Sequence, residues 1–176
     1  VKRNNMATID LTRTTCELVF NESEAELIST DTEDFNRALD IGRIMLAADT
    51  LGAGQNMIDQ AVSYAKEREQ FDQPISNFQV LQHRMVDMFI DSELAKSLLY
   101  KAMLEVDSNS DDRFKHVSAL KAHVGKFGKL SAQNAVQLHG GMGVSEEMMI
   151  GHYLKKMVAV DAMFGNADFH LKAFSK

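Results

Sequence analysis

The sequence predicts an all-α protein whose main body is an up-down-up-down antiparallel four-helix bundle, preceded by a short β-like segment. Three observations lead to this fold class. Apolar and small residues recur at alternating spacings of three and four residues, which is the pattern of helices packed at shallow angles. Pro74 is the only proline, so long helices are possible on both sides of it. Residues 1–30 lack this spacing, which divides the chain into that segment and a bundle of residues 31–176.

The segment of residues 1–30 contains two short runs with partial apolar alternation, at 7–12 and 15–20, which favour β-strands. A two-stranded ribbon is marginally stable by itself in water. This segment is therefore not expected to form a domain of its own.

The first two helices are predicted at 32–67 and 77–107. Each begins at a capping-box pattern, in which two side chains satisfy free N–H groups of the first turn: Thr30 with Glu33, and Ser76 with Gln79. The expected seam of the first helix is Ile41, Ile44, Ala48, Leu51, Gln55, Ile58, Val62 and Ala65. That of the second is Phe78, Leu81, Met85, Met88, Ser92, Ala95, Leu99, Ala102 and Val106.

The third and fourth helices are predicted at 111–138 and 145–173. The third continues the seam with Val117, Leu120, Val124, Phe127, Ser131, Asn134 and Leu138. Three small residues beside that seam, Gly125, Gly128 and Ala132, indicate close approach of a neighbouring helix. The fourth is expected to start with Glu146 and Glu147, because a helix N-terminus favours acids.

Composition excludes several classes of function. A formal net charge of −6 argues against a nucleic-acid-binding protein, which usually presents a clustered basic face. The single cysteine, Cys16, excludes an internal disulfide and offers no Cys/His spacing for a metal, so no metal is expected. The chain contains no apolar run long enough to span a membrane and begins without a signal-peptide pattern. A cytoplasmic location is predicted, with the mitochondrial matrix as the alternative.

Two segments carry the main functional signal: Arg68-Glu69-Gln70-Phe71-Asp72-Gln73-Pro74-Ile75-Ser76-Asn77-Phe78-Gln79 and Gln137-Leu138-His139-Gly140-Gly141-Met142-Gly143. A Gly-Gly-x-Gly run alone is usually a turn. Together, and between helices, the two segments resemble the C-terminal helical domain of the acyl-CoA dehydrogenase family. The resemblance covers roughly residues 37 to 172. It implies that residues 1–30 are the end of the β-rich middle domain that precedes the bundle in the family.

The resemblance implies FAD as the cofactor. In the family, the arginine matching Arg68 binds the FAD pyrophosphate of a neighbouring subunit, which suits the fixed fork of a guanidinium. The other cofactor contacts that it implies are Gln70, Phe71, Gln79, Gln137, Leu138, His139, Gly140, Gly141, Asn166 and Asp168, with Arg43 and Gly165 at the substrate. Asp72 departs from the pattern, because the family has glycine there and an acid is unfavourable beside a pyrophosphate.

Catalysis in the family requires a glutamate that removes the α-proton of an acyl-CoA thioester while a hydride passes from the β-carbon to the flavin. The two positions known for that glutamate match Gly42 and Phe164, neither of which accepts a proton. Three explanations remain open. A glutamate-bearing paralogous subunit supplies the base; the chain belongs to the flavin-dependent oxygenase-like branch of the fold; or another acid, Asp161 or Asp168, serves instead.

The resemblance also implies partners. Bundles of the family associate into dimers and tetramers, and the electron acceptor is an electron-transfer flavoprotein or a similar protein. The eleven methionines agree with an adaptable buried surface. The rival hypothesis is a non-enzymatic helical interaction module that keeps a degenerate flavin loop. The identity of the acyl chain is not readable from these residues.

Overall fold

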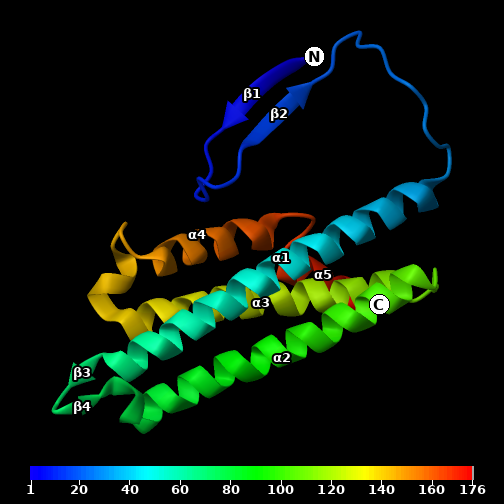
Figure 1. The fold of residues 1–176 in the computed structure, drawn as a ribbon. Helices are drawn as coiled ribbons and strands as arrows, with labels where there is room; N and C mark the ends of the chain where they lie inside the picture. Colours follow the sequence, from blue (N-terminus) through cyan, green and yellow to red (C-terminus); the bar gives the residue numbers. More distant parts are fainter. Residues whose placement is uncertain (176) are drawn as a thin grey trace.

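The computed structural model describes residues 1–175, and the predicted all-α bundle is confirmed in it (Figure 1). Helix α3 is the central element, because it contacts every other helix of the described chain. Helix α2 runs antiparallel to α1 and α3, which share one direction, and α4 returns along α3. The helices are α1 (Thr32–Glu67), α2 (Gln79–Asp107), α3 (Arg113–His139), α4 (Met149–Ala162) and α5 (Ala167–Phe174).

The predicted fourth helix, 145–173, is wrong in one respect: it is two helices separated by residues 163–166. Phe164 and Gly165 have φ angles of +56° and +98°, in the left-handed region, and such residues end an α-helix. Asn166 then starts α5, where its side chain accepts a hydrogen bond of 2.9 Å from the backbone N–H of Phe169. Asp168 is therefore not one turn further along the helix that carries residue 164.

The predicted helix starts also need correction. Asp31, not Thr30, caps α1, because its carboxylate accepts the backbone N–H of Glu33 at 2.9 Å. A 3₁₀ turn at Ile75–Asn77 precedes α2, whose N-cap is Phe78, so the second capping box does not form. A second 3₁₀ turn, Gly140–Val144, delays α4 to Met149 and leaves Glu146 and Glu147 before the helix.

The core lies along α3, where residues from α1, α2 and α4 converge on one cluster. Close approach at the small residues of α3 is confirmed. A Cβ atom on Gly128 would lie 3.0 Å from Sδ of Met157 on α4, and one on Gly125 would overlap Oδ1 of Asp161. Eleven of the 24 predicted seam residues belong to the cluster, whereas Ile41 and Ala48 are exposed. The cluster consists of Ala47, Leu51, Met57, Ile58, Ala61, Met88, Ala95, Ala102, Val106, Val117, Leu120, Val124, Phe127, Ala132, Ala135, Leu138, Ile150 and Met157.

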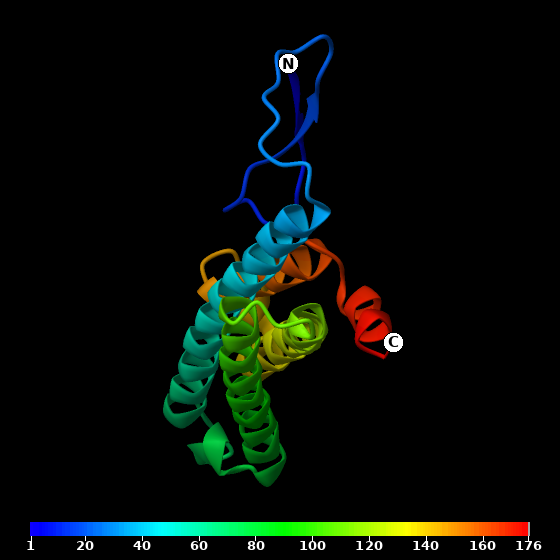
Figure 2. The same cartoon turned by 90° about the vertical axis from the view of Figure 1, so that its right-hand side faces the viewer.

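The N-terminal segment is an antiparallel hairpin of β1 (Lys2–Met6) and β2 (Thr15–Val19). The strand expected near 15–20 is confirmed, whereas the run at 7–12 is the connecting loop. Asp10 causes this difference, because its buried carboxylate accepts hydrogen bonds from the N–H and hydroxyl of Thr12 and closes a turn. Arg13 then pairs with Asp49 on α1. Figures 1 and 2 show the hairpin projecting from the bundle at one end of a long arc of chain.

Candidate functional site

Arg68 lies at the end of α1 and begins a small hairpin of β3 (Glu69–Gln70) and β4 (Gln73–Pro74). The Arg68 carbonyl accepts the N–H of Ile75 at 2.8 Å, which closes the hairpin, while its side chain is exposed. Phe71 and Asp72 form the tip, with φ angles of +54° and +61°. The left-handed φ angle of Asp72 fits the glycine that the family has at this position. Aspartate can replace that glycine because it tolerates the left-handed region better than most residues.

The ring of Phe71 is 84% exposed at that tip. An aromatic side chain that could bury a large apolar area is thus displayed beside Arg68 rather than packed in the core. Gln70 and Gln79 are exposed in the same segment. The second predicted segment follows α3, where Gln137, Gly140 and Gly141 are exposed.

Leu138 and His139 point inward instead. Leu138 belongs to the core cluster, so only its backbone is available to a ligand. His139 is buried, donates from Nδ1 to the carbonyl of Ala135 at 2.8 Å, and stacks on Tyr64 with ring centroids 4.2 Å apart. Tyr64 lies one helical turn before Arg68, and its partner directly precedes Gly140. The stack therefore joins the two predicted FAD segments at one end of the bundle.

A second group of predicted residues lies around the turn between α4 and α5. Here Gly42 on α1 and Phe164 are in contact: a Cβ atom on Gly42 would lie 3.2 Å from Cζ of Phe164. The two positions expected for a catalytic glutamate thus meet at one place, which we call the base slot. It is occupied by the aromatic ring. Arg43, the next residue on α1, directs its Nε to the carbonyl of Phe164 at 3.4 Å.

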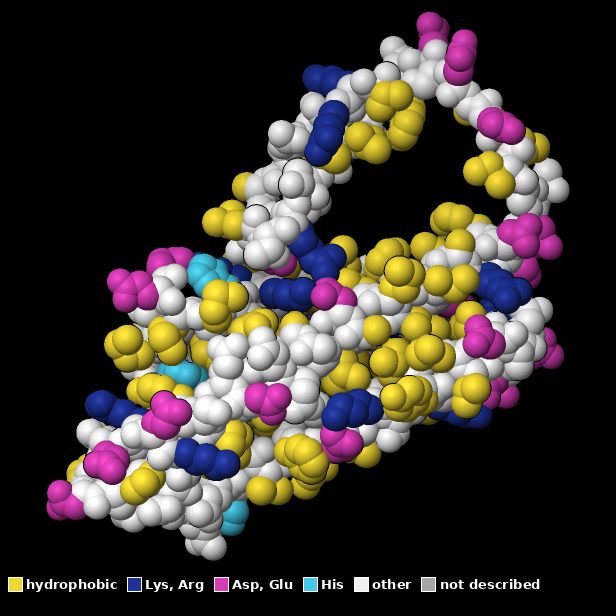
Figure 3. Space-filling view, viewed as in Figure 1, with side chains coloured by type: hydrophobic (Ala, Val, Ile, Leu, Met, Phe, Trp, Pro, Cys, Tyr) yellow, Lys and Arg dark blue, Asp and Glu magenta, His cyan; other side chains and the backbone are white. Residues whose placement is uncertain are grey.

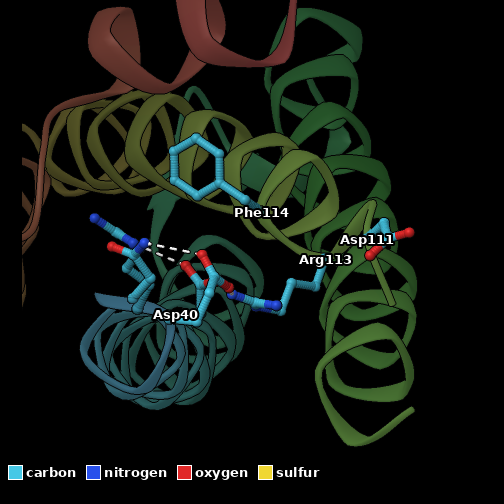
Figure 4. Close-up of a pocket in the computed structure, with 7 residues that line it drawn as sticks. Asp40, Asp111, Arg113 and Phe114 are labelled. Carbon is cyan, nitrogen blue, oxygen red and sulfur yellow. Dashed lines mark hydrogen bonds and ion pairs between the residues drawn. The ribbon is translucent and has the colours of Figure 1, made fainter. Parts of the chain in front are cut away.

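Beside the base slot is a polar cleft of about 500 Å³ between the first turns of α1 and α3 (Figure 4). Asp40 is 1% exposed and lies between two guanidinium groups, with Oδ1 2.8 Å from Nη1 of Arg43 and Oδ2 3.3 Å from Nε of Arg113. Arg113 also pairs with Glu33, and this hydrogen bond is the main cause that raises the pKa of Arg113. The guanidinium of Arg43 lies 5.5 Å from the ring centroid of Phe114.

Sequence reasoning selected Arg43 but missed Asp40, Arg113 and Phe114. The ion pairs of Arg113 with Glu33 and Asp40 join positions far apart along the chain, which periodicity does not connect. The one local signal was the three-residue spacing of Asp40 and Arg43 on a helix. Because Arg43 is already held by Asp40 and lies against Phe114, its guanidinium is fixed before any ligand arrives.

Asp161 and Asp168 differ in their surroundings. Asp161 is buried, and its carboxylate accepts from Nζ of Lys129 at 2.8 Å and from the N–H of Ala167 at 3.1 Å. It faces α3 and caps the start of α5. Asp168 is exposed in the first turn of α5, where an acid complements the helix dipole. Both acids thus have structural explanations.

The two groups of predicted residues are far apart. Gly42 lies in the first third of α1 and Arg68 directly follows its last residue, so the two are about 39 Å apart at a rise of about 1.5 Å per residue. Asn166 and Asp168 belong with the base slot, and the glycine loop with Arg68. One dinucleotide cannot reach both ends. Within residues 1–175, the structure contains no group of three or more His, Cys, Asp or Glu side chains placed to hold a metal ion.

Known proteins resemble this chain over most of its length. Residues 33–176 match the family model of the acyl-CoA dehydrogenase C-terminal domain. The probable acyl-CoA dehydrogenase YngJ of Bacillus subtilis is 34% identical over 147 residues, which cover 82% of this chain and 38% of YngJ. The caffeyl-CoA reductase-Etf complex subunit CarC of Acetobacterium woodii is 35% identical over 114 residues, 65% of this chain and 30% of CarC.

Among solved structures, butyryl-CoA dehydrogenase from Megasphaera elsdenii superposes with a TM-score of 0.89 at 26% identity, covering 98% of this chain and 46% of that one. The chain therefore spans less than half the length of these relatives. None of the helices in residues 1–175 is long and apolar enough to cross a membrane.

Proposed function

Because this chain belongs to the acyl-CoA dehydrogenase family through its C-terminal domain, we propose that it is the bundle of a flavoprotein that oxidises an acyl-CoA thioester between its α and β carbons. Residues 1–30 are, in this proposal, the last strands of the preceding β-rich domain. The observation that carries the proposal is that both halves of the flavin motif are exposed at one end of the bundle and are joined by the stack of Tyr64 on His139.

The residues at that end fit FAD, which is the cofactor that the family implies. Arg68 offers an exposed guanidinium to a pyrophosphate, and Phe71 offers an exposed apolar ring beside it. Cβ atoms built on Gly140 and Gly141 would project into open space, so the backbone there is accessible to a ligand. When bound, FAD accepts the hydride that leaves the β-carbon. Asp72 remains an unfavourable charge near the phosphates.

A dimer follows from the separation of the two groups. If Arg68 and the glycine loop hold one FAD, the base slot about 39 Å away must serve another. Each flavin then lies between two chains, with the base slot of one and the Arg68 end of the other. The apolar surface of α2 supports association, because it exposes many large side chains: Val80, Val86, Phe89, Ile90, Leu94, Tyr100, Met103 and Leu104. Figure 3 shows such side chains gathered along the bundle. Light scattering at micromolar concentration tests this, and a monomer would contradict it.

In this proposal, the chain does not supply the base that removes the α-proton. Phenylalanine and glycine cannot remove an α-proton, and Asp161 is engaged with Lys129 and Ala167. We infer that a paralogous subunit with a glutamate at this place completes the reaction. What this chain contributes is Arg43, held by Asp40, at the substrate side of the slot, together with Gly165. An electron-transfer flavoprotein is the proposed acceptor, because the relative CarC is a subunit of an Etf complex.

One observation favours a second function. An apolar ring fills the base slot. This suits the oxygenase-like branch of the fold, because the chemistry of that branch needs no α-proton base. The deciding experiment purifies the full-length protein. A yellow protein with a flavin absorption band supports both flavoenzyme proposals, and a colourless protein supports a non-enzymatic interaction module.

Activity then separates the two enzymes. Straight-chain acyl-CoA should be oxidised poorly by the protein alone and much faster when a glutamate-bearing paralogue is co-expressed, because general-base catalysis contributes about 10²–10⁴-fold. Robust oxidation by the homo-oligomer alone would refute the assignment of Phe164 and Gly42. The isolated 176-residue chain is expected to bind FAD weakly and to be inactive.

A further inference from the structure

The turn that carries Phe164 is held by side chains from other helices. Its two carbonyl groups, those of Phe164 and Gly165, point toward donors on α1, α3 and α5. Nε2 of His170 lies 2.9 Å from the Phe164 oxygen, and Nζ of Lys121 lies 2.9 Å from the Gly165 oxygen. Both donors are buried, the lysine being 1% exposed and the histidine fully buried.

Lys121 does more than contact the turn. Its Nζ also lies 3.1 Å from the carbonyl oxygen of Asp161 and 3.4 Å from that of Val160, in the last turn of α4. These three acceptors match the three donors of an ammonium group. The lysine therefore caps the C-terminus of α4 from inside the protein, where the helix dipole favours a cation. Burial lowers the pKa of Lys121, and the nearby Asp161 carboxylate opposes that shift while Arg43 and Lys129 reinforce it.

The imidazole of His170 binds the Phe164 carbonyl group and does so as one defined tautomer. The Phe164 oxygen only accepts, so Nε2 carries the proton, and Nδ1 is free to accept from the hydroxyl of Ser118 at 3.1 Å. Burial lowers the pKa of His170, which keeps this neutral form. Ser118 and Lys121 are neighbours on the same helix, one turn apart. Both donors are thus fixed by α3, the most buried element of the bundle.

We propose that Lys121 and His170, oriented by Ser118, are positioning residues that hold the side chain of residue 164 in the base slot against Gly42. They act on the backbone of residues 164 and 165, both of which have left-handed φ angles. The side chain at position 164 is thereby directed at Gly42 whatever its chemistry. This assignment rests on the proposed function only in one respect, namely that the slot is the place of a catalytic glutamate.

The contact between Phe164 and Gly42 is measurable in the 176-residue chain without cofactor or substrate. Proton NMR of the Gly42 α-protons reports the ring-current shift of Phe164, with Phe164→Leu as the zero reference. Gly54, on the same helix, provides an internal control, because a Cβ there would lie 3.1 Å from the ring of Phe127 in the core. Lys126→Met is the matched control for Lys121→Met, since Lys126 is exposed on the same helix.

Lys121→Met and His170→Leu are expected to remove at least half of the Gly42 shift while leaving Gly54 unchanged. His170→Gln, which keeps a donor at the Nε2 position, should restore most of it, and Ser118→Ala should lose part of it. Lys126→Met should change neither glycine. If Lys121→Met does not fold, the pair His170→Gln and His170→Leu decides.

Two outcomes would overturn the proposal. A full Gly42 shift in both Lys121→Met and His170→Leu would show that the turn holds itself. Equal changes at Gly42 and Gly54 would show that these residues stabilise the whole bundle rather than position residue 164. Because the measurement needs no flavin, its failure is distinct from failure of FAD binding in the full-length protein, which tests the proposed function.

Discussion

Replacing Gly42 with alanine tests whether the Phe164 ring fills the base slot in solution. Alanine in place of glycine inside a helix stabilises a protein by about 1 kcal/mol, because glycine loses more conformational freedom on folding. Gly52, ten residues further along α1, should give this full gain, since a Cβ there would meet open space. At Gly42 the new Cβ would lie 3.2 Å from Cζ of Phe164, so the ring must move by a few tenths of an ångström.

We therefore expect Gly42→Ala to stabilise the chain by less than about 0.5 kcal/mol, about half or less of the gain at Gly52. In a Phe164→Ala background the obstacle is gone, and Gly42→Ala should recover the full gain of about 1 kcal/mol. The difference is a coupling free energy of about 0.5–1 kcal/mol, at the lower end of the range of about 0.5–3 kcal/mol for residues in contact.

The assay is urea denaturation of the four proteins of this cycle, with Gly52→Ala measured in both backgrounds. All are compared at one protein concentration, because association makes apparent stability depend on concentration. Equal gains at Gly42 and Gly52, both unaffected by Phe164→Ala, would refute the reasoning, since the ring would then lie elsewhere.

Three further predictions concern separate parts of the site. Gly125→Ala should lower the free energy of unfolding by about 1–3 kcal/mol in urea denaturation, because its Cβ would overlap the Asp161 carboxylate; an unchanged midpoint would contradict this. The lowered pKa of His170 means that the unfolded chain binds this proton more tightly, so its contribution to stability is complete above the unfolded pKa of about 6.5 and declines as the pH falls below it. Between pH 7 and pH 4, the free energy of unfolding of His170→Gln should fall less steeply than that of the wild type. Parallel curves of stability against pH would show that His170 is not the origin of the loss. Arg68→Ala should reduce FAD retention by the full-length protein, measured as the flavin-to-protein absorbance ratio, without lowering the stability of the 176-residue chain, because the side chain is exposed.

The long helices were predictable because their burial pattern is periodic. The start and end of α1 agree with the expected 32–67, and the small residues of α3 indicated the close approach of α4. These features depend on neighbours three or four residues away, which a single sequence displays.

The break between α4 and α5 was missed because its cause is tertiary. Phe164 has no intrinsic preference for a left-handed φ, and donors from α3 and α5 hold its turn. Gly165 followed by Asn166 was the available signal, since glycine often ends a helix and asparagine often begins one. The alternating run at 7–12 was misread for a related reason: Asp10 uses its carboxylate to close a turn there.

The candidate site likewise contains residues that could be predicted from the sequence and residues that could not. Arg68, the glycines after α3 and the base slot were reached through the resemblance, because short motifs carry them. The ion pair of Asp40 with Arg113 joins α1 to the start of α3, and pairing over 73 residues leaves no trace in one sequence. The long separation of the two groups along α1 likewise becomes evident only when helix length is converted into distance.

Residue 164 is fixed by its backbone rather than by its side chain. Its ring is partly exposed and touches Gly42, whereas its carbonyl group receives hydrogen bonds from Arg43 and His170. A different side chain at this position would leave those hydrogen bonds intact, so the turn is independent of the chemistry that it presents. By the proposal above, loss of Lys121 should instead release the end of α4 and the slot together. Under the proposed function, a chain without a glutamate at position 164 keeps the turn that would direct one, as the proposed pairing with a glutamate-bearing subunit of the same fold requires.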